Sequence, residues 1–414
     1  MTKHVFIIGS KGIPASYGGF ETFVDRLVEK RKNTQIQYHV ACMGEENRTF
    51  EYLGAECFQL PVPKIGPARA VYYDIMALRA SLRSIRAHHW EDAVIYVLAC
   101  RIGPWIGYYK RKLHKSGVRL FVNPDGHEWL RAKWSPAIRR YWKFSERLMV
   151  KHADLLICDS KNIELYIQQE YAAYTPKTTY IAYGADVEPG SSVSDVSAHT
   201  GEEQEQEEQE QEKQEQEKQE QEALKEWYQM HAITPQAYYL VVGRFVPENN
   251  YETMLREFIA SKTTKDLVLI TNAEQNAFYD TLVETTDFKR DKRIKFVGTV
   301  YDAGMLNHIR RDAFAYLHGH EVGGTNPSLL EALSMTDVNL LLDVGFNREV
   351  AEQGALYWHK EIGDLTRTLA AADAMTASDR QALGQLARQR IREHYSWDGI
   401  VQAYETLFMT GDIL

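Results

Sequence analysis

The chain has 414 residues, of which 44% are apolar, 11% aromatic and 25% charged, and its formal net charge at pH 7 is -9. At roughly 150 residues per domain, this length predicts two or three domains with full-sized cores. A single small binding module, a collagen-like chain and a disulfide scaffold are excluded.

The charge is unevenly distributed along the chain. Residues 1–150 carry 24 Lys and Arg against 13 Asp and Glu, whereas residues 202–222 carry 11 Glu and 2 Lys. A basic N-terminal part favours an anionic partner, which could be an acidic membrane surface, a pyrophosphate-linked substrate or a nucleic acid. The sign of the charge does not choose among them.

The first part of the chain alternates short β-branched apolar runs with amphipathic stretches, which predicts a parallel sheet covered by helices. The predicted strands are 4–8, 38–42, 93–98, 119–123 and 155–158. Between the first two strands, apolar residues recur at helical spacing over residues 20–28 and predict a helix. A glycine-rich loop, residues 9–22, therefore joins the first strand to this helix.

A second run of the same kind follows the middle of the chain. Its predicted strands are 238–242, 266–270, 294–298, 313–318 and 338–343. The sequence thus predicts two doubly wound α/β domains, residues 1–189 and 223–395, followed by a C-terminal helix in residues 396–414 that packs back on the N-terminal domain.

Residues 190–222 separate the two domains and are of low complexity. The 21 residues from 202 to 222 are only Glu, Gln and Lys, so they offer nothing to bury in a core. We expect an insert that is either disordered or a solvated helix. It is interpreted as an expansion in a surface loop, with a protein-binding role as the alternative.

Four cysteines, Cys42, Cys57, Cys100 and Cys158, lie without a C-x-x-C pair or a His at ligand spacing, which predicts reduced packing thiols. No apolar stretch approaches the roughly 20 residues that span a bilayer, and the first residues lack the apolar segment of a signal peptide. The sequence predicts a cytoplasmic protein.

Gly18 and Gly19 precede the first predicted helix, where backbone N–H groups and the helix N-terminus receive an anion. The spacing is not G-x-G-x-x-G, so a dinucleotide site is not predicted. A ligand-binding loop is favoured over a structural turn because adjacent glycines allow a ligand close to the backbone. Arg244 follows the strand 238–242 at the edge where such folds bind ligands, and its guanidinium can hold a phosphate.

The letters GGTNPSLLEAL mark a loop and the start of a helix. Gly323 and Gly324 leave room for backbone N–H groups to face an anion, while Asn326 suits the cap and Pro327 the first turn. The helix dipole would then point at a diphosphate. Glu331 lies about one turn further, where a carboxylate can accept hydrogen bonds from ribose hydroxyls; a solvated helix Glu is the alternative.

Seven motifs occur in order outside the insert: GIPASYGGFET, NPDGHEW with AKWSP, ADLLICDS, GRFVPENNYE, FVGTVYD, GHEVGGTNPSLLEAL and DVGFNREV. Through them nearly the whole chain resembles retaining glycosyltransferases of the GT-B fold, and among these the bacterial rhamnosyltransferases that build capsule and cell-wall polysaccharides. The resemblance implies an α/β protein with two tandem Rossmann-like domains and a cleft between them. It implies an acceptor site in the N-terminal domain and a nucleotide-sugar site, for dTDP-L-rhamnose, in the C-terminal domain.

The resemblance also assigns roles within the donor site. Arg244 would clamp the diphosphate, Glu331 would hold the ribose, and Val300 with Tyr301 would meet the base. The expected donor-binding set is Gly18, Gly19, Arg244, Asn249, Val300, Tyr301, Gly323, Gly324, Thr325, Asn326, Pro327 and Glu331. The wider GT-B pattern has Glu at the position of Gly323 and Lys at that of Asn249; these departures bear on the donor and match the rhamnosyltransferase branch.

Candidate catalytic residues follow two strands of the first domain. Asp125, His127 and Glu128 are three ionisable groups in four residues and can position or deprotonate an acceptor hydroxyl. Asp159 follows the strand 155–158 and would face the same cleft. The alternatives are a loop histidine at His127 and a helix cap at Asp159.

The expected reaction is transfer with retention of configuration and with no metal ion or cofactor, driven by charge stabilisation on the leaving diphosphate. The resemblance implies a saccharide acceptor on polyprenyl pyrophosphate at the inner face of the plasma membrane. A basic amphipathic stretch with Arg69, Arg79, Arg83 and Arg86 could rest on anionic headgroups, or it could be an ordinary domain helix.

Two other classes stay open, namely another nucleotide-sugar enzyme of the epimerase kind and a non-catalytic nucleotide-sugar-binding protein. A nucleic-acid partner is not expected, because the basic residues lack an aromatic-interleaved binding motif.

Overall fold

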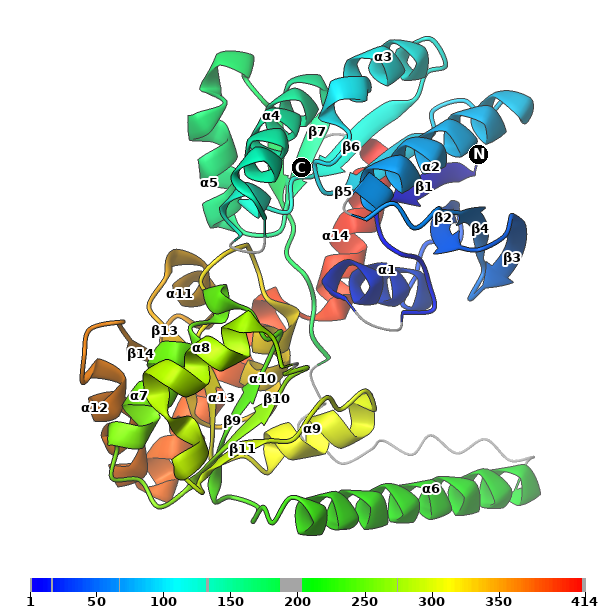
Figure 1. Ribbon diagram of the computed structural model, residues 1–414. Helices are drawn as coiled ribbons and strands as arrows, with labels where there is room; N and C mark the ends of the chain where they lie inside the picture. Colours follow the sequence, from blue (N-terminus) through cyan, green and yellow to red (C-terminus); the bar gives the residue numbers. More distant parts are fainter. Residues whose placement is uncertain are drawn as a thin grey trace.

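The computed structural model describes residues 2–15, 18–66, 68–131, 134–186, 203–273 and 275–411. Two α/β domains face each other, and the chain passes between them twice (Figure 1). Part of the expected insert, residues 190–202, lies outside the described residues.

The N-terminal domain is built on an eight-stranded sheet in the described residues, with strand order β3-β4-β2-β1-β5-β6-β7-β8. Its strands are β1 (Lys3–Ile8), β2 (Ile36–Gly44), β3 (Arg48–Tyr52), β4 (Ala55–Pro61), β5 (Val94–Leu98), β6 (Arg119–Asn123), β7 (Leu155–Cys158) and β8 (Thr178–Tyr180). All neighbours are parallel except β3 and β4, which form an antiparallel hairpin.

Helices cover both faces of this sheet. They are α1 (Gly19–Glu29), α2 (Ala68–Ala87), α3 (Gly103–His114), α4 (Pro136–His152) and α5 (Lys161–Glu170), with short 3₁₀ turns η1 (Glu128–Leu130) and η2 (Ala172–Tyr174). Side chains alternate between the faces: Val5 and Ile7 belong to the core under α1, and Phe6 and Ile8 to the core under α2 to α5.

The C-terminal domain has a parallel six-stranded sheet in the described residues, with order β11-β10-β9-β12-β13-β14. Its strands are β9 (Tyr238–Val242), β10 (Asp266–Ile270), β11 (Ile294–Phe296), β12 (Ala315–His318), β13 (Asn339–Leu342) and β14 (Leu356–Trp358). Its helices are α7 (Tyr251–Ala260), α8 (Ala277–Thr286), α9 (Ala303–Arg311), α10 (Pro327–Met335), α11 (Gly345–Ala351), α12 (Asp364–Ala374) and α13 (Ala377–His394), with turns η3 (Pro247–Asn249) and η4 (Phe288–Arg290).

The strand order reverses at β1 and β5 in the first sheet and at β9 and β12 in the second. Open α/β sheets bind ligands outside the carboxyl ends of the strands at such a reversal. The loops that follow these strands are therefore the places where a ligand site is expected.

Helix α6 (Glu203–Met230) runs from the glutamate-rich segment into the C-terminal domain without a break at residue 223. Its last turns bury Leu224, Trp227 and Tyr228, and the Tyr228 hydroxyl donates to Oδ2 of Asp312 at 3.0 Å. The described part of the expected insert, residues 203–222, is thus helical and continuous with a packed element.

Helix α14 (Trp397–Thr410) lies on the N-terminal domain, although it follows the C-terminal one (Figure 1). The hydroxyls of Tyr404 and Tyr96 are 3.1 Å apart. The Glu405 carboxylate accepts from the backbone N–H groups of Lys32 and Asn33 at 2.8 and 3.1 Å. This packing ties the two ends of the chain to one domain.

The four cysteines are buried and free, as predicted. None of the helices in the described part of the chain has the length and apolar character needed to cross a bilayer.

Candidate functional site

A cavity of about 990 Å³ lies between the two domains, at the carboxyl ends of both sheets. All the described residues expected in the donor site line this cavity, as do Asp125, Glu128 and Asp159. This cavity brings the sequence motifs of both domains together, and we refer to it as the cleft.

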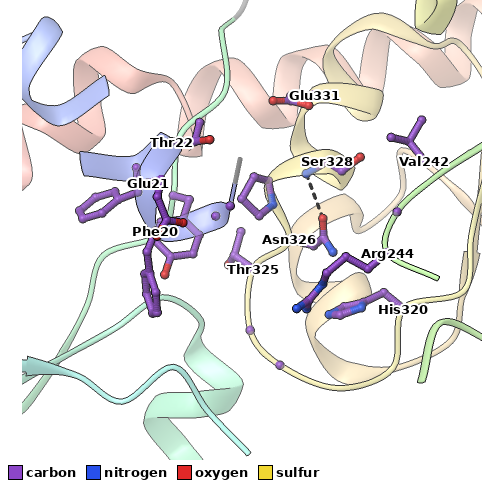
Figure 2. A pocket seen from close by; sticks show the side chains of 18 of the residues that line it. Phe20, Glu21, Thr22, Val242, Arg244, His320, Thr325, Asn326, Ser328 and Glu331 are labelled. Carbon is purple, nitrogen blue, oxygen red and sulfur yellow. Dashed lines mark hydrogen bonds between the residues drawn. The ribbon is translucent and has the colours of Figure 1, made fainter. Parts of the chain in front are cut away.

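The loop from β12 to α10 forms one wall of the cleft. Pro327 is the first residue of α10, and Oδ1 of Asn326 accepts from the N–H groups of Ser328 and Leu329 at 2.9 and 3.3 Å (Figure 2). The predicted cap and first turn are both present. The capped helix directs the positive end of its dipole into the cleft.

Three consecutive N–H groups precede this cap. Gly323, Gly324 and Thr325 are buried, and in the described part of the chain their backbone N–H groups donate to no protein acceptor. Buried backbone donors are nearly always paired. A ligand with several acceptor oxygens, such as a phosphate, would satisfy them.

Gly324 also sits against the other domain. A Cβ at this position would lie 2.1 Å from Oδ1 of Asp159, and the Thr325 hydroxyl donates to the backbone carbonyl of Asp159. A side chain at residue 324 would therefore force the domains apart, which explains a glycine there.

Helix α1 begins on the opposite wall. A Cβ on Gly19 would lie 3.9 Å from Cγ of Pro327, so the N-termini of α1 and α10 converge on the same space. Figure 2 shows Phe20, Glu21 and Thr22 across the cleft from Thr325 and Asn326. Two helix N-termini that face one cavity favour an anionic ligand.

The Glu21 carboxylate accepts from the N–H of Lys11 at 2.7 Å. The side chain of this first-turn residue thereby holds the glycine-rich loop against α1. Residues 16 and 17 of that loop lie outside the described residues.

Arg244 leaves the end of β9 and projects into the cleft beside His320 (Figure 2). Its side chain is exposed and, among the described residues, forms no ion pair. A cation held without a protein counterion at the edge of the cleft is available to a ligand phosphate.

Asn249 and His320 form a fixed pair next to Arg244. Nδ2 of Asn249 donates to the carbonyl of Arg244 at 2.8 Å, which leaves its Oδ1 to accept from Nδ1 of His320, also at 2.8 Å. Burial, with the charges nearby, lowers the pKa of His320 well below its ordinary value. The neutral ring therefore presents Nε2 as an acceptor; a Cβ on Gly323 would lie 3.4 Å from this atom.

The loop after β6 brings two of its three candidate residues, Asp125 and Glu128, to the wall of the cleft. Asp125, Gly126 and His127 all have positive φ, of 60°, 72° and 52°. Asp125 and the following Glu128 line the cleft. His127 is not among the residues that line the cavity, and its ring lies 4.1 Å from that of Tyr166, against α5. A role for His127 in orienting the acceptor stays a prediction.

Asp159 lies at the end of β7 and is 3% exposed. It is not the cap of α5, because Ser160 takes that place and accepts from the N–H of Ile163. Burial, together with the charge of Asp125, raises the pKa of Asp159 to about 8. Burial also raises the pKa of Asp125, although the nearby Arg131 opposes that change.

Three arginines that sequence reasoning did not single out face this region. Arg131 is buried and ion-paired with Glu128, and Arg101 donates to the carbonyl of Gly9 at 2.7 Å. Arg310, on α9, is paired with Glu331 at 2.5 Å. Arg131 lies between the quoted motifs NPDGHEW and AKWSP and three residues after Glu128, so its spacing was a usable signal; Arg101 and Arg310 carried none.

The remaining donor candidates lie further along the C-terminal wall. The Glu331 side chain is 35% exposed and lines the cleft next to α9. Val300 and Tyr301 follow β11, and the Tyr301 ring is largely exposed. An exposed aromatic ring beside a cleft is available for stacking.

Known structures of the same architecture cover the whole chain. Sucrose-phosphate synthase from Thermosynechococcus elongatus superposes with a TM-score of 0.73 at 15% identity, over 99% of this chain and 100% of that one. The match over both domains of this chain decides the fold. The chain has the GT-B fold.

Two further GT-B structures match over similar lengths. HepE from Anabaena, in complex with UDP, has a TM-score of 0.64 and 12% identity over 99% of this chain and 100% of that chain. A glycosyltransferase from Rickettsia africae has a TM-score of 0.67 and 10% identity over 99% and 98%. The structural neighbours of this GT-B protein are thus glycosyltransferases.

Comparison of the amino-acid sequence with known families identifies only the N-terminal domain. A family model described as a domain of unknown function, DUF1972, matches residues 2–186, which is the N-terminal domain. No curated protein sequence matches the chain.

Proposed function

We propose that this GT-B protein is a retaining glycosyltransferase that moves L-rhamnose from dTDP-L-rhamnose to a saccharide acceptor on polyprenyl pyrophosphate, in cell-surface polysaccharide synthesis. One observation carries the proposal: the backbone N–H groups of the buried residues Gly323–Thr325 have no acceptor among the described residues. They lie at a capped helix N-terminus, in the same cleft as Arg244, which forms no ion pair with a described residue. A nucleoside diphosphate supplies the oxygens that this arrangement lacks. The neighbour with bound UDP supports a nucleotide ligand.

The donor half of the reaction follows from the charges. When the bond between the sugar C1 and the diphosphate breaks, negative charge grows on the β-phosphate. Arg244 and the N–H groups before α10 are fixed before the reaction begins, so they stabilise this charge without reorganising. The proposed reaction therefore uses no metal ion or cofactor, while Glu331 binds the ribose and Val300 with Tyr301 meets the base.

The acceptor half belongs to the N-terminal wall. The acceptor oxygen forms a bond to C1 on the face from which the diphosphate departs, and its proton passes to the leaving diphosphate. Asp125 orients this hydroxyl, helped by Glu128. Asp159, whose pKa is about 8, is protonated at neutral pH and donates a hydrogen bond rather than repelling the diphosphate.

Donor identity is proposed to depend on the departures from the wider GT-B pattern. Gly323 removes a carboxylate from the sugar site, and the neutral His320, oriented by Asn249, supplies a ring acceptor in its place. A single acceptor with less charge suits a deoxysugar, which has one hydroxyl fewer.

The test is a donor screen. Purified protein is incubated with dTDP-L-rhamnose, UDP-glucose, UDP-GlcNAc or GDP-mannose and with a synthetic lipid-pyrophosphate-GlcNAc acceptor, and products are read by mass spectrometry. A product heavier by one deoxyhexose is expected. Transfer of another sugar would overturn the donor assignment but keep the reaction class, and nucleotide binding without any product would favour the non-catalytic class.

A further inference from the structure

The outer sides of α2, α3 and α4 form a surface that exposes basic and aromatic side chains. The three helices pack on the same core, α3 lies against α4, and Arg86 near the end of α2 donates to Ser116 and to the Lys112 carbonyl at the end of α3. They therefore form one continuous layer (Figure 1). We call its outward side the basic-aromatic face.

The charge of this layer has a single sign. The three helices carry 12 Lys and Arg, and their only acidic residues, Asp74 and Glu146, are buried. The exposed basic side chains are Arg79, Arg83, Arg86, Arg111, Arg140, Arg147 and Lys151, with Lys115 just beyond α3. By contrast, α13 exposes Asp379 and Glu393 among its arginines. Two of its lysines pair with acidic residues of adjoining segments, Lys110 with Asp154 and Lys143 with Glu170, whereas the exposed arginines of the three helices have no exposed acidic residue beside them on these helices. Such a layer attracts an extended anionic surface.

Large aromatic side chains stand among these cations. Tyr72 on α2, Trp105 and Tyr108 on α3 and Phe144 on α4 are 39%, 42%, 57% and 46% exposed. Such rings are costly to leave in water and prefer the boundary between headgroups and acyl chains. Nucleic acid or another polyanion would use the cations but offers no apolar layer for these rings.

The apolar stripe of α2 is not part of this surface. Leu78, Leu82 and Ile85 are buried in the domain core. The sequence pattern alone allowed the apolar side of this helix to contact a bilayer, but in the structure that side is covered by the domain. Its outward side carries Tyr72 and the three exposed arginines.

We propose that the basic-aromatic face docks on a bilayer that contains anionic phospholipid. The three helices begin at the cleft, since Ala70, Arg101 and Trp134 line its wall. A lipid-borne acceptor in that bilayer would reach the cleft along the surface, a link that rests on the proposed function. The docking itself rests only on the charge and exposure of the face.

Flotation of the full chain tests the proposal, with vesicles of phosphatidylcholine alone or with phosphatidylglycerol in equal parts. The wild-type protein is expected to float with the mixed vesicles only, and less so as salt is raised. The variant Arg83→Glu/Lys115→Glu reverses two exposed charges on the face, and we expect its vesicle affinity to fall roughly 30-fold or more, because each basic residue near an anionic surface contributes about a fivefold change.

Two further variants complete the experiment. Lys262→Glu/Arg392→Glu makes the same charge change on exposed residues of the C-terminal domain and should float like wild type. Trp105→Ser/Tyr108→Ser keeps every charge and should still lose affinity. Equal losses in both charge variants, or no loss in the aromatic variant, would overturn the assignment.

Competition with a DNA duplex tests whether the basic-aromatic face binds nucleic acid instead of lipid. If duplex DNA bound with the same dependence on Trp105 and Tyr108, the lipid assignment would be wrong. Binding of dTDP, measured separately by calorimetry, should be unchanged in all variants. A wild-type protein that floats but transfers no sugar would refute the proposed function and leave the docking surface standing.

Discussion

At the scale of single residues, the cleft combines buried carboxylates with arginines that are only partly neutralised. Asp159 is the clearest case, because its two carboxyl oxygens are enclosed at the end of β7, and Oδ1 has no hydrogen-bond partner among the described atoms. Burial and the charge of Asp125 disfavour ionisation, which is why the pKa of Asp159 rises to about 8. The group is thus kept neutral where an anionic ligand is expected.

Asp159→Asn should therefore change how stability depends on pH. An unfolded Asp has a pKa of about 3.9, so between that pH and about 8 the folded wild type holds a proton that the unfolded chain has lost. The wild-type free energy of unfolding must then fall as pH rises through this window. Asn keeps the shape and has no proton to lose.

Urea unfolding at about pH 5 and about pH 9 checks this linkage. The free energy of unfolding of the variant, relative to that of the wild type, should be higher at about pH 9 than at about pH 5. The control Glu164→Gln, a change on the side of α5, should show the same difference from wild type at both pH values. Parallel pH profiles for wild type and Asp159→Asn would show that the carboxyl is ionised in the folded protein.

Glu331→Gln tests the expected ribose contact. Hydrogen bonds to a charged group contribute about 1.5–3 kcal/mol, so dTDP affinity measured by calorimetry should fall roughly tenfold or more. Because Glu331 also pairs with Arg310, the thermal unfolding of the variant is measured as well, to detect any loss of stability. Unchanged dTDP affinity, relative to Glu393→Gln on α13, would contradict the role in ribose binding.

At the scale of elements, the start of α10 decides where the anion site lies. Asn326 and Pro327 fix the first turn, and the preceding N–H groups are left unpaired and buried. Asn326 therefore belongs to both the helix cap and the anion site. The cap requires a hydrogen-bond acceptor at this position, whereas the anion site excludes a negatively charged side chain there.

Substitution of Asn326 separates these demands. Asn326→Ala should lower the free energy of unfolding by about 1 kcal/mol through the lost cap. Asn326→Asp keeps an acceptor and should preserve stability, yet its charge should weaken dTDP binding more than Ala does. Urea unfolding and calorimetry check the pair; an aspartate variant that binds dTDP like wild type would place the diphosphate elsewhere.

Sequence reasoning reached the elements that carry strong patterns. The bounds of β6, β7, β9 and β10 agree with the predicted strands, because buried parallel strands are short, continuous apolar runs. The hairpin of β3 with β4 was not predicted, since its residues are half exposed and mix polar with aromatic side chains. The three-residue strands β8 and β14 are too short to show a period.

The parts of the site that could be predicted are those in which residue types with known backbone preferences determine the local conformation. The capping residue Asn326, Pro327 and the paired glycines Gly323 and Gly324 predicted the loop before α10. The orientation of His127 was not accessible, because three successive positive φ angles depend on how the loop packs on α5. Arg310 could not be found either, since its partner Glu331 lies on another helix.

At the scale of the whole molecule, the two domains are held together by a few polar contacts beside the cleft. The Glu349 carboxylate on α11 accepts from the N–H groups of Lys161 and Asn162 and from Nδ2 of Asn162, at 2.8, 3.2 and 2.8 Å. A side chain of one domain thus supplies acceptors for the first N–H groups of α5 in the other. These bonds are exposed, whereas the bond from the Thr325 hydroxyl to the Asp159 carbonyl is buried, so Glu349 supplies the solvent-accessible part of the contact between the domains.

Glu349→Ala should loosen this closure without unfolding either domain. We expect a larger radius of gyration by small-angle X-ray scattering for the nucleotide-free variant, and recovery of the wild-type value when dTDP bridges the two walls. Glu352→Ala is the matched control, because Glu352 pairs with Arg390 inside the C-terminal domain. Identical scattering from both variants would show that Glu349 does not hold the domains closed.

Glycosyl transfer by this protein is tested most directly by the stoichiometry of one reaction. Wild-type protein is given dTDP-L-rhamnose and the lipid-pyrophosphate acceptor, and released dTDP and extended acceptor are quantified together, beside Arg244→Ala. We expect one dTDP released for each acceptor extended, with the anomeric configuration retained, and a rate at least about a hundredfold lower for the variant, which lacks a preorganised charge. Donor consumed without extension of the acceptor would contradict this expectation.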